Sequence, residues 1–521
     1  MYNLASMILM RSFYAFILVV FLKINGIAQP NFVVIISDDM GWNGTSVQMH
    51  ENRTDSKSGL YFTPNIDSLM AKKGRVFTKG YVAASKCAPS RCAIQTGKSA
   101  PRNHFTETGS GLSSGEIMTA AATDRDINPS DTTLAEWLKQ TGQGYTTAHF
   151  GKWHLGDEEP YQPHKRGFAE AFIHGAGGIG QAYNCSCADA PGNKYFNPTI
   201  RHNGSFVKTE GYCTDLFFTA GMGWIKKMKD QGKPFFAYIS TNAPHGPFIA
   251  PPSNTKRFTD LGFSEKTAGF YGMIENIDEN MGRLMKKIDD WKLSKNTILI
   301  FMSDNGMTGG GSGRGKVGRS IDGMPMEVYN ANMKGQKGSP DEGGVRVPFF
   351  VRWQGKLEAN RKIKRIAAHI DLLPTLADIA GIDQLPKDQV EGQSLVPLLK
   401  NPKAKWKDRH LFTQVARWKT GSEPTDHMWK SFAVRNQRYR LVGSNLYDME
   451  ADPEQKINIA KQNPDIVGSM RKAYEKFWKE TRPLMVNEDA PMSPTRPFHI
   501  WHAQQLKAGG IQMWKAPSFY P

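Results

Sequence analysis

"FVVIISDD", residues 32–39, decides the expected fold of this chain. Its apolar, β-branched start predicts a strand, and Asp38 and Asp39 follow that strand at once. Similar short runs alternate with helical patterns from residue 31 to about 400. This alternation predicts an α/β domain with a large, mostly parallel mixed sheet flanked by helices. Because ligands of such sheets bind at the carboxyl ends of the strands, the residues that follow each strand are the first candidates for a functional site.

Three further strand-like runs end in polar residues. They are "GYTTAHF" (144–150) before Lys152 and His154, "PFFAYIS" (234–240) before Asn242 and His245, and "NTILIFMS" (296–303) before Asp304 and Asn305. Each motif also has a purely structural explanation. Paired aspartates can cap a helix, Asp-Asn-Gly can form a turn, and a histidine between prolines can order a loop. Four strands would bring acids, a lysine and histidines to one edge of the sheet, and this convergence favours a shared site.

The residue types at this edge indicate one kind of chemistry. Four side chains offer hard oxygen ligands, which favour calcium or magnesium over zinc: Asp38, Asp39, Asp304 and Asn305. Three others can donate to anionic oxygens or transfer protons: Lys152, His154 and His245. Together they predict a site that holds a tetrahedral anionic ester, either a phosphate or a sulfate, on one divalent cation.

"CAPSRCAIQTGK", residues 87–98, contains the most specific motif of the chain. Taken alone, Cys87 could form a disulfide, fill a small core position, act as a nucleophile or bind a metal. The segment from Cys87 to Arg91 matches the C-x-P-S-R signature of the type I sulfatases, members of the alkaline phosphatase superfamily, and "TGK" (96–98) matches its downstream part. The resemblance implies that a separate formylglycine-generating or other sulfatase-maturing enzyme oxidises Cys87 to formylglycine. Cys92, by contrast, is expected to be a small core residue.

The resemblance covers nearly all of the chain after residue 29. The matching segments are "PNFVVIISDDMGW" (30–42), "GKWHLG" (151–156), "NAPHGPF" (242–248), "SDNG" (303–306), "KGSPDEGGVRVPFFVRWQGK" (337–356), "HIDLLPTLADIAG" (369–381), "EGQSLVPLL" (391–399) and "LYDMEADPEQKINIA" (446–460). It adds Lys337 to the site, where this side chain would contact the substrate sulfate. It also implies Cys87 as a further ligand of the cation that Asp38, Asp39, Asp304 and Asn305 would hold.

The resemblance implies a mechanism. The formylglycine aldehyde hydrates to a diol, and one hydroxyl, activated by the cation with Asp304 as base, attacks sulfur. Arg91 would hold the diol, while Lys152 and Lys337 neutralise sulfate oxygens. His245 would protonate or stabilise the departing alcohol, and His154 would deprotonate the second hydroxyl. The predicted catalytic residues are Cys87, Arg91, Lys152, His154, His245 and Lys337.

Residues 1–28 have the pattern of a secretory signal, because Arg11 precedes an apolar run that ends in small residues. Cleavage near Ala28/Gln29 would yield a secreted or periplasmic protein. The run from Phe13 to Leu22 is short for a membrane span and no later stretch is long enough, so we expect no stable membrane insertion. The formal charge is +17, and removal of residues 1–28, whose charged side chains are Arg11 and Lys23, leaves +15.

This basic charge limits the classes of partner. The lysines are spread along the chain, and no zinc-finger spacing or aromatic RNA-binding signature is present, which argues against nucleic acid. A soluble polyanion such as a sulfated carbohydrate fits better. The main hypothesis is an exported sulfatase acting on a sulfated carbohydrate or polysaccharide. The alternatives are a phosphate or phosphonate ester hydrolase of the same superfamily and a non-catalytic protein that binds sulfated glycans. The intact C-x-P-S-R and the absence of extra metal-ligand histidines favour sulfate over phosphate.

Two structural units are expected after the signal segment. Residues 29–400 would form the catalytic α/β domain. Residues 401–521 would form a smaller C-terminal α+β domain with an antiparallel sheet, a helix near 464–480 and a tail from 491 that packs on the main domain. Within the catalytic domain we expect a helix from about Ser90 to Thr96 whose amino end points to the site.

Other predictions concern a helix, the remaining cysteines and two loops. "MIENIDENMGRLMKKI" (273–288) has apolar residues at helical spacing, and its acids Glu275, Asp278 and Glu279 should lie mostly on the solvated face. Cys213 could form a disulfide with Cys185 or Cys187, or the three could bind a soft metal. Residues 174–213 and 307–336 and the tail are the candidates for choosing the substrate.

Overall fold

The computed structural model describes most of the chain after residue 28. The described residues are 29–106, 118–119, 127–140, 142–182, 188–308, 318–319, 325–326, 328–382, 385, 389–415, 417–418, 424–485 and 495–518. Within them no helix combines the length and apolar character needed to cross a membrane.

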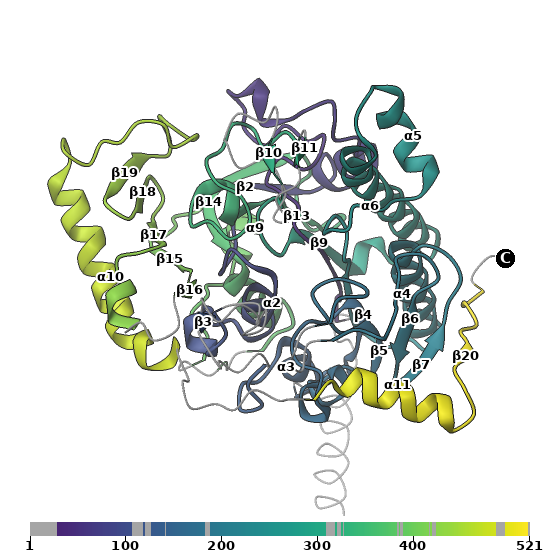
Figure 1. The fold of residues 1–521 in the computed structure, drawn as a ribbon. Helices are drawn as coiled ribbons and strands as arrows, with labels where there is room; N and C mark the ends of the chain where they lie inside the picture. Colours follow the sequence, from purple (N-terminus) through teal and green to yellow (C-terminus); the bar gives the residue numbers. More distant parts are fainter. Residues whose placement is uncertain are drawn as a thin grey trace, which may run out of the picture.

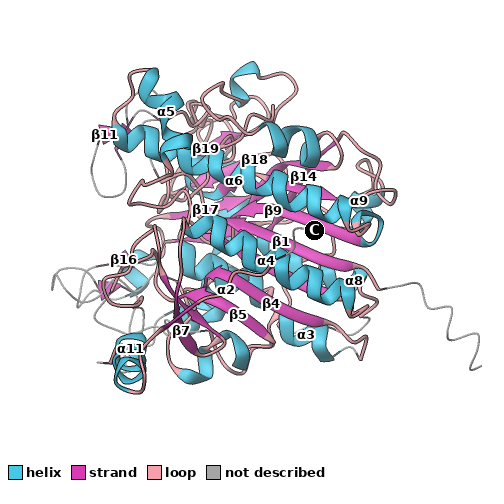
Figure 2. Cartoon of the chain, turned by 90° about the vertical axis from the view of Figure 1, so that its right-hand side faces the viewer, coloured by secondary structure: helices cyan, strands magenta, loops and turns pink. Residues whose placement is uncertain are grey.

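The centre of the molecule is a 12-stranded sheet (Figures 1 and 2). Its middle strands are parallel neighbours in the order β9 (Thr297–Ser303), β1 (Asn31–Ser37), β8 (Phe235–Ser240), β4 (Thr146–Lys152) and β5 (Glu170–His174). Such a parallel centre confirms the predicted α/β fold and brings the carboxyl ends of these strands to one edge.

Mixed strands extend this parallel centre on both sides. Beyond β9 come β13 (Phe349–Arg352), β2 (Arg75–Tyr81), β12 (Arg346–Val347) and β14 (Arg361–Ala368), of which only β14 runs parallel to β2. Beyond β5 come β6 (Thr199–His202), β7 (Ser205–Lys208) and β20 (Gln512–Met513). The sheet is therefore mixed, as predicted, with its antiparallel pairs confined to the two sides.

Helices cover both faces of the sheet because the side chains of β1 alternate between two apolar cores. Val33 and Ile35 belong to the core that contains α4 (Cys213–Asp230), α5 (Pro252–Asp260) and α6 (Glu265–Asp290). Phe32, Val34 and Ile36 belong to the opposite core, which contains α2 (Cys87–Thr96), α3 (Leu134–Gln140), α8 (Leu372–Ile379) and α9 (Val396–Lys400). This two-sided burial explains why the strand is a continuous apolar run.

The predicted helix 273–288 lies within α6, and its apolar positions are buried. One expectation about its acids is wrong: Asp278 is 1% exposed. Its carboxylate accepts hydrogen bonds from the backbone N–H groups of Asn65 (3.0 Å) and Ile66 (2.7 Å). These groups begin the π-helical turn Ile66–Ala71 and would otherwise be unsatisfied. Asp278 therefore joins that turn to α6, a tertiary contact that helical spacing does not reveal.

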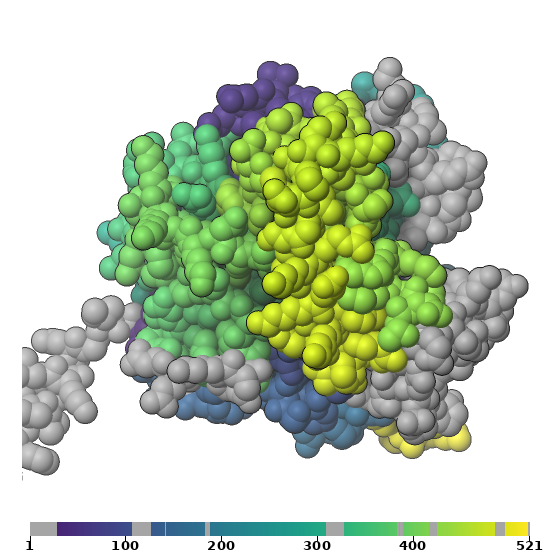
Figure 3. Space-filling model, turned by 90° about the vertical axis from the view of Figure 1, so that its left-hand side faces the viewer, coloured from purple at the N-terminus to yellow at the C-terminus, as the bar shows by residue number. Residues whose placement is uncertain are grey.

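The C-terminal region divides into two parts. Strands β15 (Leu411–Gln414), β17 (Phe432–Arg435), β18 (Tyr439–Val442) and β19 (Asn445–Asp448) form the expected antiparallel sheet, and α10 (Pro464–Met485) packs on it through a separate apolar core. Figure 3 shows this part, in yellow-green, against the rest of the molecule. The tail then returns through α11 (Pro497–Lys507) to β20, and Trp514 packs on Phe172 with ring centroids 4.7 Å apart. The prediction that the tail packs on the main domain is confirmed.

The remaining elements are short. They are the helices Thr54–Ser56, Pro101–Asn103, Glu159–Tyr161, Pro163–Lys165, Ser294–Asn296, His369–Asp371, Pro424–His427 and α7 (Glu342–Val345), and the strand pairs β3 (Met118–Thr119) with β16 (Arg417–Trp418) and β10 (Gly318–Arg319) with β11 (Pro325–Met326).

A buried charge cluster links the small sheet to the large one. Glu342 accepts hydrogen bonds from the Tyr81 hydroxyl at 2.9 Å and from Arg440 Nε at 3.1 Å. Arg435 and Arg346 lie 3.5 and 3.7 Å from the same carboxylate. Although burial opposes its ionisation, Arg440 and Arg346 lower the pKa of Glu342 to about 2. The Glu342 carboxylate therefore holds positive charges from both units at the loop that follows Lys337.

Candidate active site

Backbone hydrogen bonds fix the relative positions of the strand ends that carry the predicted acids. The N–H of Asp38 donates to the carbonyl of Ala243 at 2.9 Å, and that of Asp304 donates to Ser37 at 3.0 Å. The N–H of Asp39 donates to Asp304 Oδ1 at 3.1 Å. Asp39 has a φ of 65°, in the left-handed region that few non-glycine residues adopt. The ends of β1, β8 and β9 thus form one connected edge.

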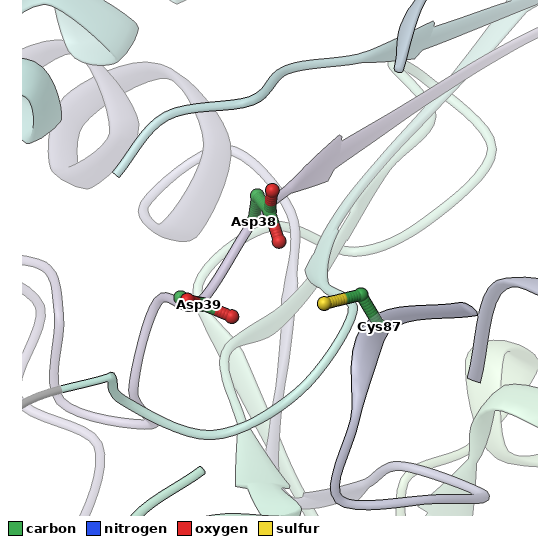
Figure 4. Close-up of side chains that lie close together, drawn as sticks. All are labelled: Asp38, Asp39 and Cys87. Atoms are coloured by element: carbon green, nitrogen blue, oxygen red, sulfur yellow. The ribbon is translucent and has the colours of Figure 1, made fainter. Parts of the chain in front are cut away.

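Cys87 is the first residue of α2 and is buried. Figure 4 shows its sulfur and the carboxylates of Asp38 and Asp39 directed toward one another. The potential ligand atoms of these three residues all lie within 4.8 Å of each other. Burial raises the pKa of the Cys87 thiol. The structure therefore brings together the signature cysteine and the two aspartates, which are 48 residues or more apart in the sequence.

The helix that carries Cys87 begins three residues earlier than predicted. We expected a helix from about Ser90, and α2 spans Cys87–Thr96. Pro89 lies in the first turn, where a proline costs little because the N–H it lacks would have no intrahelical partner. The helix therefore includes Cys87 and presents its amino end, with the positive end of the helix dipole, to the acidic edge.

Arg91, one turn after Cys87 on α2, connects the helix to three strands. Its Nε donates to Asp304 Oδ2 at 2.9 Å, its Nη2 lies 3.7 Å from Asp38 Oδ1, and its Nη1 donates to the Ser240 hydroxyl. Although burial opposes ionisation, Arg91 and Lys152 lower the pKa of the Asp304 carboxyl. The guanidinium group is thus held beside residue 87 by the same carboxylates that form the acidic edge.

Two lysines complete the charge balance of the edge. Lys152, the last residue of β4, donates to Asp38 Oδ2 at 2.6 Å. Lys337 Nζ lies 2.8 Å from Asp39 Oδ1, and Asn305 Nδ2 donates to the same oxygen at 2.7 Å. Although burial raises the pKa of Asp39, Lys337, His245 and Lys152 together lower it below its ordinary value. Although burial disfavours the charged lysine, Asp39 and the neighbouring Cys87 hold the pKa of Lys337 well above its ordinary value.

The two predicted histidines, of which His154 is buried and His245 partly buried, are neutral at neutral pH. Burial and the adjacent Lys152 lower the pKa of His154 well below its ordinary value, and neither ring nitrogen has a hydrogen-bond partner among the described residues. Burial and Lys337 lower the pKa of His245 to about 3. His245 Nδ1 donates to the Gly246 carbonyl at 2.7 Å, so its Nε2, 3.9 Å from Asp39, carries the lone pair. Both rings can accept a proton in this state.

The donor set fits a hard divalent cation. The side chains at the edge offer carboxylate and amide oxygens, which are ligands of calcium and magnesium. Two buried oxygens, Asp38 Oδ1 and Asn305 Oδ1, have no hydrogen-bond partner within the described part of the chain. Burial and the nearby Asp304 raise the pKa of Asp38 well above its ordinary value. A cation in contact with these oxygens would satisfy them and would stabilise the ionised form of Asp38.

One pair of residues that supports the site was not predicted from the sequence. The Ser90 hydroxyl lies 2.7 Å from His369 Nδ1, and His369 Nε2 lies 2.9 Å from the carbonyl of Ser303. Because a carbonyl can only accept, Nε2 carries the proton and Nδ1 accepts from Ser90. Both side chains are fully buried. The pair ties α2 to the end of β9 immediately before Asp304. Two sequence features could have indicated the Ser90–His369 pair: the serine of the C-x-P-S-R signature and the family-like segment that begins at His369.

The loops predicted to choose the substrate are described in part. Tyr195, from residues 174–213, donates its hydroxyl to the carbonyls of His245 and Gly246, each at 3.1 Å. Cys213 begins α4 as a buried free thiol, so the disulfide left open for this residue is not formed. Cys185, Cys187 and most of residues 309–327 lie outside the described residues.

Family comparisons assign this arrangement to a class of enzymes. Residues 30–382 match the family described as Sulfatase, and residues 340–480 match the family described as N-sulphoglucosamine sulphohydrolase, C-terminal. The first match covers more than half of the 521 residues. The chain therefore belongs to the sulfatase family, within the alkaline phosphatase superfamily, and is a sulfuric ester hydrolase.

Individual relatives agree with this assignment. The chain is 27% identical over 537 aligned positions to an uncharacterized sulfatase of Escherichia coli, with 88% of each chain covered. It is 31% identical over 381 positions to the N-acetylgalactosamine-6-sulfatase of Rattus norvegicus, covering 71% of this chain and 66% of that protein.

A solved structure has the same fold. It is described as Ps i-CgsB in complex with k-i-k-neocarrahexaose, and it superposes with a TM-score of 0.71 at 24% identity, covering 88% of this chain and 95% of the other. A second, described as BT4656 in complex with its substrate D-Glucosamine-2-N, 6-O-disulfate, superposes with a TM-score of 0.64 at 19% identity, covering 88% of this chain and all of the other.

Proposed function

We propose that this protein is an exported sulfatase that removes sulfate groups from a carbohydrate polymer by means of a formylglycine formed from Cys87. The observation that supports this most directly is the meeting of Cys87, Asp38 and Asp39 within 4.8 Å at the edge where Lys152 and Lys337 also converge. The names of similar proteins support the carbohydrate, because they include an N-acetylgalactosamine-6-sulfatase and a protein crystallised with a sulfated glucosamine.

In this proposal the cationic side chains bind the sulfate group. Lys152 and Lys337 place two buried ammonium groups at the acidic edge, where they would neutralise sulfate oxygens as charge develops on them. Arg91, one helical turn from residue 87, would orient the hydroxyl groups of the hydrated formylglycine. A calcium ion bound by Asp38, Asp39, residue 87, Asp304 and Asn305, or magnesium as the alternative, would supply a Lewis acid beside the reacting group.

The histidines move protons in this proposal. His154 is neutral and buried, so it can accept the proton of the second hydroxyl group on residue 87 when sulfate is released. His245 is also neutral, with its lone pair on Nε2. To protonate a departing alcohol it must first gain a proton, which the negative charge of a bound sulfate ester would favour by raising its pKa.

Residues 1–28 support export, because they match the pattern of a cleaved secretory signal. A maturing enzyme is required as a partner, because a cysteine gives no aldehyde by itself. The fully buried helix α2 would have to be accessible to that enzyme, so the oxidation would precede folding.

Mass spectrometry of a tryptic digest tests the central part of the proposal. Cleavage after Lys86, Arg91 and Lys98 separates residues 87–91 from residues 92–98, so Cys92 serves as an internal control. We expect the first peptide to be about 18 Da lighter than its unmodified mass and the second to be unchanged. An unmodified Cys87 in protein that hydrolyses 4-nitrophenyl sulfate would contradict the formylglycine, and preferential hydrolysis of 4-nitrophenyl phosphate would contradict the sulfate specificity.

A further inference from the structure

A positively charged cavity lies far from the acidic edge. It has a volume of about 640 Å³, within the range of small-ligand sites, and three exposed lysines line it: Lys73, Lys292 and Lys295. None of these lysines forms an ion pair with any residue that the structure describes. Arg352 and Asp289 also line the cavity, so its walls carry four positive groups against one carboxylate. The excess of positive charge selects for an anionic ligand.

Arg352 gives this cavity a buried, partly unsatisfied cation. Its side chain is 2% exposed, and its Nη2 donates to Asp289 Oδ1 and to Gln354 Oε1, each at 3.2 Å. Its Nη1 has no hydrogen-bond partner among the described residues. A buried guanidinium nitrogen without a partner is costly, and an oxyanion would satisfy it with the geometry that arginine favours. The lining of the cavity therefore combines surface charge with a buried guanidinium group whose hydrogen bonds are incomplete.

The walls of the cavity are held together by contacts between the ends of different strands. Trp353, directly after β13, donates its indole N–H to the carbonyl of Lys295 at 3.1 Å. Ser294 donates its hydroxyl to Asp289, which also accepts from Arg352. These contacts fix the loop before β9 against the end of β13.

The cavity lies at the amino end of the parallel strands, opposite the acidic edge. Lys295 precedes β9, and Asp304 follows it. Seven extended residues at about 3.3 Å each separate the two ends by about 23 Å. A sulfate group bound in the cavity therefore cannot at the same time contact Cys87 or the predicted cation ligands.

We propose that this cavity, lined by Lys73, Lys292, Lys295 and Arg352, binds a sulfated segment of an anionic polysaccharide at a position separate from the active site. The guanidinium group of Arg352 would hold one sulfate group, and the three lysines would contact neighbouring sulfate groups of the same chain. Such binding would keep the enzyme on a polymer between successive reactions. The inference rests on the proposed function only for the identity of the polymer.

Binding to dextran sulfate, with unsulfated dextran as the neutral control, tests this inference. The test variant is the triple substitution Lys73→Gln, Lys292→Gln, Lys295→Gln. The matched control is Lys461→Gln, Lys472→Gln, Lys479→Gln, which removes the same charge from exposed lysines of the C-terminal region. All three proteins carry Cys87→Ala, so turnover does not remove ligand, and affinity is measured by calorimetry at about 0.1 M NaCl, where charges more than about 10 Å apart are screened.

We expect the test variant to bind dextran sulfate at least about tenfold more weakly than the parent, and the control variant to change by less than about twofold. Inorganic sulfate at equal sulfate concentration should compete poorly. Equal loss in the two triple variants would overturn the inference, because binding would then follow net charge. Full competition by inorganic sulfate would also overturn it, because the cavity would then be a simple anion site. Since binding is measured without turnover, these results are independent of whether Cys87 becomes formylglycine.

Discussion

Replacement of Glu342 by glutamine should destabilise the protein by roughly 3 kcal/mol at neutral pH. Glu342 is fully buried among three arginines, of which Arg440 is the nearest, at 3.1 Å. The substitution keeps the size of the side chain and removes the charge that these arginines require. The substitution would weaken the contact between the small sheet and the loop after Lys337.

The magnitude follows from the pKa of this carboxyl. Although burial opposes ionisation of Glu342, Arg440 and Arg346 lower the pKa of this carboxyl from 4.5 to about 2. At about 1.4 kcal/mol per pKa unit, this difference corresponds to roughly 3 kcal/mol of stability for the ionised form. The value agrees with the cost of losing one partner of a buried ion pair, which is about 3–5 kcal/mol. Because the folded pKa is the lower one, this stability is present above about pH 4.5 and is lost as pH falls toward 2.

Urea unfolding, followed by fluorescence between pH 7 and pH 3, measures this effect. We expect a constant difference between parent and Glu342→Gln down to about pH 4.5, and a smaller difference below it, because glutamine does not titrate. Arg438→Gln is the control, since it breaks the exposed pair between Arg438 and Asp448, worth less than about 1 kcal/mol. Equal unfolding free energies for the parent and Glu342→Gln at pH 7, or a difference that does not depend on pH, would refute the reasoning.

Three further predictions concern the site itself. Cys87→Ser should hydrolyse no more than one equivalent of ester and retain sulfate on residue 87, because serine lacks the second hydroxyl group; mass spectrometry of peptide 87–91 checks this, and steady turnover would contradict it. His369→Leu leaves the Ser90 hydroxyl and the Ser303 carbonyl without partners. It should cost about 2–4 kcal/mol of stability and lower kcat while changing KM less, and His369→Gln should restore part of the stability and of kcat. An unchanged kcat in the leucine variant would show that the pair does not position α2. Removal of divalent cations by a chelator should abolish activity, and calcium should restore it at lower concentration than magnesium; full activity in the chelated protein would contradict the cation site.

Much of the fold and of the site could be predicted from the chain alone. The parallel centre followed from apolar runs such as residues 32–37, and the acidic edge followed from what stands after each run, because the carboxyl ends of parallel strands meet. Lys337 follows no such run, and only its resemblance to a family motif indicated it. The structure brings all of these residues to one edge.

Other features depended on contacts between distant segments. Asp278 has the spacing of an exposed helical residue, yet it is buried because Ile66–Ala71 turns its backbone N–H groups toward it. The ties from Ser90 to His369 and from Glu342 to Arg440 join residues 279 and 98 positions apart. The sequence by itself indicated most of the side chains at the acidic edge, because residue type and the end of each apolar run are local properties. Only the tertiary structure decided which charges are neutralised, which donors stay unsatisfied and which surface is left with an excess of positive charge, because these depend on packing between distant parts of the chain.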